Sequence, residues 1–222
     1  MIFALCVKLY YIMTASNHPY FEGEYPLIMP HRGGMEVVPE NTLEAIDYCD
    51  KNKFTHFETD LRMSKDEVVF LHHDETLERT TDSQGRVEEY YWRDLLKVNA
   101  GQQFYDKNNI IGKRTHFVSL EDALTKFSDM KFNLDIKQKG ISKNVLEIIM
   151  DCKASKRTLV SSFSPKRLKQ FQKLNKYNIA TSGSVKENLQ AMLNSKIINI
   201  WDLQVEALQV PIKWKGIRVL TK

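Results

Sequence analysis

Two pairs of ionisable residues share one spacing in this sequence. Glu58 and Asp60 lie two residues apart in the stretch FETDLR, and Asp135 and Lys137 lie two apart in FNLDIK. Both stretches are otherwise apolar, as buried strands are, and residues two apart on a strand point to the same face. A carboxylate on a buried face needs a cation to offset its desolvation. The two pairs therefore predict one charged site shared by neighbouring strands.

Three of these side chains are carboxylates: Glu58, Asp60 and Asp135. A set of oxygen donors without a thiolate suits a hard divalent cation such as Mg²⁺ or Ca²⁺. We therefore predict one bound divalent cation, and the residues do not choose between the two metals.

Two histidines stand at the ends of two further apolar stretches, His31 after PLIMP and His73 within VVFLHHD. Imidazole titrates near neutral pH, which suits general acid–base chemistry. Arg32 adds a planar fork that matches a phosphate or a carboxylate, and Lys137 adds a point charge. This combination predicts chemistry on an anionic substrate.

Each residue also has a purely structural explanation. A strand-end histidine is commonly a hydrogen-bonded structural residue, and a strand-end aspartate is commonly a turn former or a helix cap. We expect His72, on the opposite face from His73, and His56, deep in its strand, to be structural. What favours one site is the coincidence, because four successive strands end in ionisable groups of matching parity.

Strand-like and helical stretches alternate along the chain. The strand-like runs cover 26–31, 54–60, 67–74, 131–137, 157–163, 177–181, 197–203 and 216–220, and the helical periods cover 42–52, 119–127, 142–153, 165–175 and 185–194. Alternation without long hairpins predicts a parallel sheet covered by helices. Asn41 or Thr42 is expected to cap the first helix. The polar segment 75–116 is too long for a simple loop and is expected to be an insertion over one end of the sheet.

Composition narrows the classes of protein. The 222 residues carry a net charge of +4 without a long basic run, so we predict no nucleic-acid partner. Cys6, Cys49 and Cys152 show no metal-ligand spacing and indicate free thiols in a reducing compartment. The apolar residues 1–12 are interrupted by Lys8 and are too short to span a bilayer. We predict a cytoplasmic protein without an integral membrane segment, with export from the apolar N-terminus or a start at Met13 as alternatives. The oligomeric state stays open.

Several motifs together resemble the glycerophosphodiester phosphodiesterase family, of the bacterial type with a single barrel domain. They are HRGG, PENTLEA, FETDLRMSKDEVVFLHHDETLERTTD, FNLDIK and LVSSF, in this order, and they cover about residues 26 to 165. The resemblance implies a (β/α)₈ TIM barrel of the phospholipase C-like phosphodiesterase type, with a small insertion that matches 75–116. It divides the chain into an N-terminal extension, 1–25, and a barrel, 26–222.

The same resemblance implies a role for each candidate residue. It implies metal ligands at Glu58, Asp60 and Asp135, an acid–base pair at His31 and His73, and substrate phosphate contacts at Arg32 and Lys137. The family commonly has Glu where this chain has Asp135. Glu40, in the PENT motif, is expected to bond to Arg32 or the backbone, or to serve as an acid at a helix N-terminus. The implied reaction is metal-dependent hydrolysis of a glycerophosphodiester to glycerol 3-phosphate and an alcohol, with water or a substrate hydroxyl as the attacking group.

The C-terminal part departs from the family pattern. The chain runs WDLQVEALQVPIKWKGIRVLTK and stops, without the family's Trp-Thr-x-Asn-like strand and closing helix. We expect Trp201 and Trp214 to be packing residues, with replacement of the family's aromatic platform as the alternative. We expect a truncated barrel of poor stability, with closure by 216–220 or by a partner chain as alternatives.

Two other functions stay open. One is a phospholipase D-like enzyme acting on lysophospholipids or sphingolipids, which the polar insertion disfavours; the other is an inactive barrel that binds phosphorylated ligands, which the histidine pair disfavours.

Overall fold

A computed structural model describes residues 17–23, 25–196, 203–210, 213–214 and 217–218. Cys6, Met13, Trp201 and most of the predicted strand 197–203 lie outside the described residues, and Trp214 is described only by its backbone. Within the described helices, none is long and apolar enough to cross a membrane.

Five strands form one sheet in the order β2–β1–β3–β4–β5. Their bounds are β1 (His56–Met63), β2 (Val69–Leu71), β3 (Lys131–Ile136), β4 (Thr158–Ser161) and β5 (Ala180–Thr181). From β1 through β3 and β4 to β5, each strand is parallel to its neighbour and a helix separates it from the next, which is how a βα barrel progresses. Isolated parallel bridges, His31 to Glu58 and Ser182 to Ala207, extend this order by one segment on each side. The full eight-stranded barrel stays a prediction.

Two strand expectations are wrong. The run 67–74 does not form a parallel strand: β2 is antiparallel to β1, and Ser64 closes the turn between them by accepting a hydrogen bond at its hydroxyl from the backbone N of Val68 at 3.0 Å. The run 26–31 forms only the bridge at His31, because Pro26 and Pro30 lack the N–H that a strand ladder needs.

The helices match the predicted periods closely. They are α1 (Leu43–Lys51), α4 (Leu120–Lys126), α5 (Ser142–Asp151), α6 (Pro165–Leu174) and α7 (Val185–Lys196). Thr42 caps α1 by accepting from the backbone N of Ala45 at 3.2 Å, as expected, and Ser119 caps α4 in the same way. The buried side chains of these helices and of the outer sheet face form the main core: Ala45, Ile46, Cys49, Phe57, Ala123, Leu124, Phe132, Leu134, Ile136, Val145, Ile149 and Phe171 among them.

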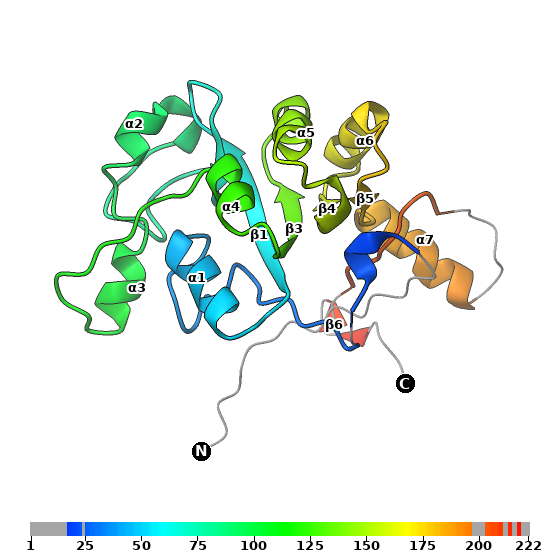
Figure 1. The fold of residues 1–222 in the computed structure, drawn as a ribbon, viewed down its shortest axis with the longest axis horizontal. Helices are drawn as coiled ribbons and strands as arrows, with labels where there is room; N and C mark the ends of the chain where they lie inside the picture. The colour runs from blue at the N-terminus through cyan, green and yellow to red at the C-terminus, as the bar shows by residue number, and fades with distance from the viewer. Residues whose placement is uncertain (1–16, 24, 197–202, 211–212, 215–216, 219–222) are drawn as a thin grey trace, which may run out of the picture.

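The polar segment 75–116 has its own small core. It contains a 3₁₀ helix (Val87–Glu89), α2 (Trp92–Leu95) and α3 (Gln102–Lys107). Leu77, Val87 and Leu95 pack there against Phe70 of β2, so the segment is attached to the β2 edge of the sheet. Figure 1 shows α2 and α3 on one side of the molecule and α5, α6 and α7 on the other.

Two short elements lie near the chain ends. A 3₁₀ helix (Pro19–Phe21) falls within the predicted extension 1–25, and its Tyr20 packs with Met29, Leu159 and Ala180. Near the other end, β6 (Lys213–Trp214) and β7 (Ile217–Arg218) pair with each other. Among the described residues, β7 of the predicted run 216–220 is therefore part of this hairpin and not of the main sheet.

Candidate active site

The register of the parallel strands sets the candidate residues side by side. Asp60 of β1 is the partner of Asp135 of β3, and Asp135 in turn is the partner of Ser161 of β4. Glu58 lies one level lower, opposite Asn133. The predicted spacing of two thus places Glu58, Asp60 and Asp135 on one face, while Phe57 belongs to the helix-covered core on the other.

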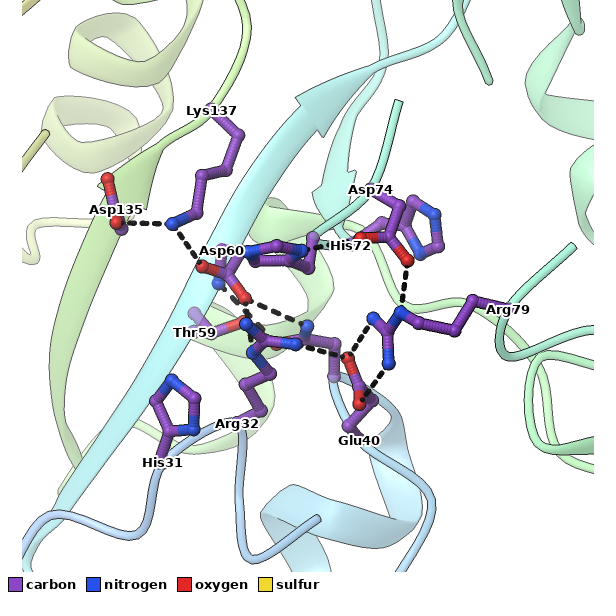
Figure 2. Close-up of polar contacts among 12 residues, drawn as sticks. His31, Arg32, Glu40, Thr59, Asp60, His72, Asp74, Arg79, Asp135 and Lys137 are labelled. Carbon is purple, nitrogen blue, oxygen red and sulfur yellow. Dashed lines mark hydrogen bonds and ion pairs between the residues drawn. The ribbon is translucent and has the colours of Figure 1, made fainter. Parts of the chain in front are cut away.

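Lys137 joins the two aspartates. Its Nζ lies 3.1 Å from Asp60 Oδ1 and 2.6 Å from Asp135 Oδ2 (Figure 2). Both aspartates are buried, with exposed fractions of 1% and 2%. Asp135 Oδ1 is also buried, and no described group forms a hydrogen bond with it. One lysine charge therefore stands against two carboxylates, and one of their buried oxygens accepts no hydrogen bond from the described residues.

The crowding of acids shows in their pKa values. Burial, followed by the charges of Asp60 and Asp135, raises the pKa of Glu58 well above the usual glutamate value. Burial also raises the pKa of Asp135, against the pull of Lys137. Burial would raise the pKa of Asp60 too, but Lys137 and Arg32 outweigh it and hold that pKa below its usual value. A cation at this place would remove the cost of ionising all three acids together.

Arg32 is held in a tight turn. Its φ is 54°. The following Gly33 has a φ of 83°, and a Cβ added there would also lie 2.5 Å from Ala45 Cβ, so both the backbone and the surroundings favour glycine. The backbone N of Arg32 donates to Glu58 Oε2 at 2.9 Å, and its side-chain Nη1 donates to Glu40 Oε1 at 2.9 Å. The contact between Arg32 and Glu40 confirms one of the roles expected for Glu40.

The guanidinium of Arg32 also reaches the carboxylate centre. Its Nε lies 3.0 Å from Asp60 Oδ2, within ion-pair distance but without the alignment of a hydrogen bond. The turn thus brings Arg32 to the acids of β1, where its remaining donors can meet an anionic ligand.

Asn41 is a site neighbour that sequence reasoning placed elsewhere, as a helix cap. Its Nδ2 donates to Asp60 Oδ2 at 3.2 Å, and its Oδ1 accepts from Thr59 Oγ1 at 2.7 Å. Its φ of 56° is a conformation that Asn tolerates better than most residues do. The signal was the PENT motif itself, in which an Asn follows Glu40 directly.

His73 stands at the start of a chain of charged groups. Its Nδ1 lies 2.6 Å from Asp74 Oδ1, and Arg79 Nε donates to Asp74 Oδ2. Arg79 also donates to both oxygens of Glu40, from Nη1 to Oε2 at 2.9 Å and from Nη2 to Oε1 at 2.8 Å. Through Glu40 the chain continues to Arg32, as the dashed lines of Figure 2 show. Sequence reasoning missed both Asp74 and Arg79.

The remaining histidines differ in setting. His31 Nε2 lies 3.9 Å from Glu58 Oε2, beside the carboxylates. His72 is buried, its Nε2 lies 3.0 Å from the carbonyl of Thr76, and it stacks on Phe70. His56 is fully buried and its Nε2 lies 3.2 Å from the carbonyl of Tyr20. Both settings are structural, as expected for His72 and His56.

Comparison with known proteins settles the family. The sequence pattern of the glycerophosphoryl diester phosphodiesterase family matches residues 31–213, which include every candidate residue above. The chain belongs to this family.

Relatives and solved structures agree with that assignment. A probable glycerophosphodiester phosphodiesterase 2 of Mycobacterium tuberculosis is 28% identical over 202 residues, covering 88% of this chain and 72% of the relative. A Bacillus altitudinis glycerophosphodiester phosphodiesterase is 32% identical over 155 residues, or 66% of this chain, and the match spans 62% of that relative's length. The crystal structure of a glycerophosphoryl diester phosphodiesterase domain from M. tuberculosis has the same fold, with a TM-score of 0.70 at 22% identity, covering 82% of this chain and 68% of that domain.

Members of this family generally use divalent cations, and the residues here suit one in chemistry. All candidate ligands are oxygen donors, and Asp135 Oδ1 has no hydrogen-bond partner among the described groups. With every acid ionised, the five carboxylates of the network would exceed its three cationic side chains by two charges: Glu40, Glu58, Asp60, Asp74 and Asp135 against Arg32, Arg79 and Lys137. No three described His, Cys, Asp or Glu side chains already stand as a ligand set.

Proposed function

We propose that this chain hydrolyses glycerophosphodiesters to glycerol 3-phosphate and an alcohol with the help of one divalent cation. The observation that carries the proposal is the convergence of Asp60, Asp135 and Arg32 at one end of the sheet, with His31 and His73 on flanking segments, in a member of this family. A phosphodiester monoanion resists attack because of its own charge, so it needs cationic groups and an acid–base pair.

The histidines supply the proton transfers in this proposal. Ionised Asp74 can only accept a hydrogen bond, so the neutral ring of His73 carries its proton on Nδ1 and leaves Nε2 as the exchangeable nitrogen. One histidine removes a proton from the attacking group, water or a substrate hydroxyl, and the other protonates the leaving alkoxide. Arg32 and Lys137 hold the phosphoryl oxygens as negative charge develops on them.

Glu58, Asp60 and Asp135 would hold the cation. When bound, a divalent ion at this place polarises the phosphoryl group and neutralises developing charge. Because the Lys137 ammonium contacts both aspartates, we expect the lysine to leave at least one of them when the ion binds and to turn toward the substrate.

The test is turnover of glycerophosphocholine by the purified chain with Mg²⁺ or Ca²⁺, with and without a chelator, followed as glycerol 3-phosphate. We expect cation-dependent release that the chelator abolishes. Turnover that persists in the chelator would overturn the metal role. The relatives are longer than this chain, so a version extended to their length serves as a second enzyme sample if the chain does not fold alone.

Two further substrate arms separate the alternatives. Release of choline from lysophosphatidylcholine without glycerophosphocholine turnover would favour the phospholipase D-like function. Binding of glycerol 3-phosphate by a folded, metal-loaded protein without turnover of either substrate would favour a ligand-binding barrel.

A further inference from the structure

We propose that Arg79 is a positioning residue that locks His73 and Arg32 into one geometry, a role that rests on the proposed function above. Arg79 comes from the insertion that follows β2, while its partner Glu40 comes from the loop before α1. Arg79 and Glu40 are 39 residues apart in sequence. Their contact connects the segment that carries His73 to the loop that carries Arg32.

The contacts of Arg79 divide cleanly between the two loops. Its Nε donates a hydrogen bond to Asp74 Oδ2. The other oxygen, Asp74 Oδ1, is hydrogen-bonded with His73 Nδ1 at 2.6 Å. Its two terminal nitrogens serve both oxygens of Glu40, at 2.8 and 2.9 Å. A planar guanidinium offers these donors in a fixed fork, which a lysine ammonium cannot copy.

Each end of the link acts on a group of the proposed reaction. At one end, Asp74 fixes the orientation and the tautomer of the His73 ring, because an ionised carboxylate accepts only from a ring N–H. At the other end, Glu40 Oε1 accepts from Arg32 Nη1 at 2.9 Å and holds that side chain toward Asp60. Arg79 therefore acts on His73 through Asp74 and on Arg32 through Glu40.

Burial favours a positioning role over a purely surface ion pair. Glu40 has 9% of its side chain exposed and Arg32 has 12%, so their pairing is shielded from water, whereas Arg79 covers them with 44% exposed. An arginine of comparable exposure, paired with exposed acids, gives the matched control. Arg86, also in the insertion and 46% exposed, forms ion pairs with the surface acids Glu75 and Glu88.

The experiment compares Arg79→Met, Arg79→Lys and the control Arg86→Met. We expect Arg79→Met to lower kcat by about 10- to 100-fold through misplacement of His73 and Arg32. Arg79→Lys should recover only part of this loss, and Arg86→Met should stay within about twofold of wild type. A rise in KM with unchanged kcat would overturn the proposal, because it would make Arg79 a direct substrate contact.

A second readout needs no turnover. In protein labelled with ¹⁵N-histidine, at a pH where the ring is neutral, the signal of His73, assigned with His73→Ala, should show one Nδ1–H tautomer in wild type and in Arg86→Met. In Arg79→Met and in Arg79→Lys it should move toward a mixture of tautomers. An unchanged His73 signal in the folded Arg79 variants would overturn the proposal. If wild type failed to turn over glycerophosphodiesters, the proposed function would fall and the spectrum would still decide the role of Arg79.

Discussion

Lys137 Nζ lies 2.6 Å from Asp135 Oδ2, while the other oxygen of that carboxylate is buried and accepts no hydrogen bond from the described residues. Lys137 therefore contacts only one of the two oxygens of this buried carboxylate. Because Asp135 is the register partner of Asp60, its second oxygen is where a divalent ion would bind most favourably.

Glu58→Gln is expected to weaken binding of Mg²⁺ or Ca²⁺ because it removes one of three carboxylates in the cluster. In wild type, an ion at 100 times its Kd stabilises the fold by about 2.7 kcal/mol, visible as a rise in Tm. Glu58→Gln should lose most of that rise, together with turnover. Asp94→Asn, which removes an exposed acid paired with Lys97, serves as the control and should keep the rise. An equal rise in Glu58→Gln and wild type would contradict the ligand role.

His73→Ala is expected to remove turnover and keep metal binding. Loss of a general acid or base costs about 10²- to 10⁴-fold in rate, and the carboxylate cluster does not include His73. Steady-state kinetics and the metal-induced rise in Tm measure the two effects separately. The matched variant is His116→Ala, an exposed histidine in the insertion, which should leave both unchanged. Near-normal turnover by His73→Ala would show that His31 has another partner.

Gly33→Ala is expected to destabilise the fold because both its backbone and its surroundings exclude a side chain. The φ of 83° is left-handed, and the new Cβ would stand 2.6 Å from Phe57 Cε2. Strain and overpacking together cost about 2 to 5 kcal/mol. Gly112→Ala isolates the strain, since its φ is 73° but no described atom lies within 4 Å of the added Cβ; it should cost about 1 to 2 kcal/mol. Urea unfolding measures both, and equal losses would refute the steric explanation.

Glu40→Gln is expected to flatten the loss of stability in acid. Burial alone would raise the pKa of Glu40, but the hydrogen bonds and charges of Arg79 and Arg32 lower it below its usual value of 4.5. A lowered folded-state pKa stabilises the fold above pH 4.5, and that gain disappears as the pH falls through the folded-state pKa. Thermal melts from about pH 6 to 3 should therefore fall less steeply for Glu40→Gln than for wild type. An identical slope would mean that Glu40 is not paired in solution.

The parts of the fold and site that depend on local pattern could be predicted from the sequence. Spacing of two gave the common face of Glu58 and Asp60, and the helical periods gave helix ends within a few residues, with Thr42 as a cap. The reversed direction of β2 was missed although the connection 64–68 is too short for a crossover between parallel strands, which needs about a dozen residues. Arg79 was missed for a different reason: its partner is 39 residues away, and no local pattern specifies such a contact.

The reversed β2 has a consequence for the chemistry. This strand runs antiparallel to β1, so the backbone N of His72 donates to the carbonyl of Asp60 at 2.9 Å, and His73 is the next residue. Which of the two adjacent histidines faces the proposed site thus depends on the length of one turn, 64–68. A single residue added to that turn, with β2 shifted by one place along β1, would put His72 where His73 now stands and move His73 on to the place of Asp74.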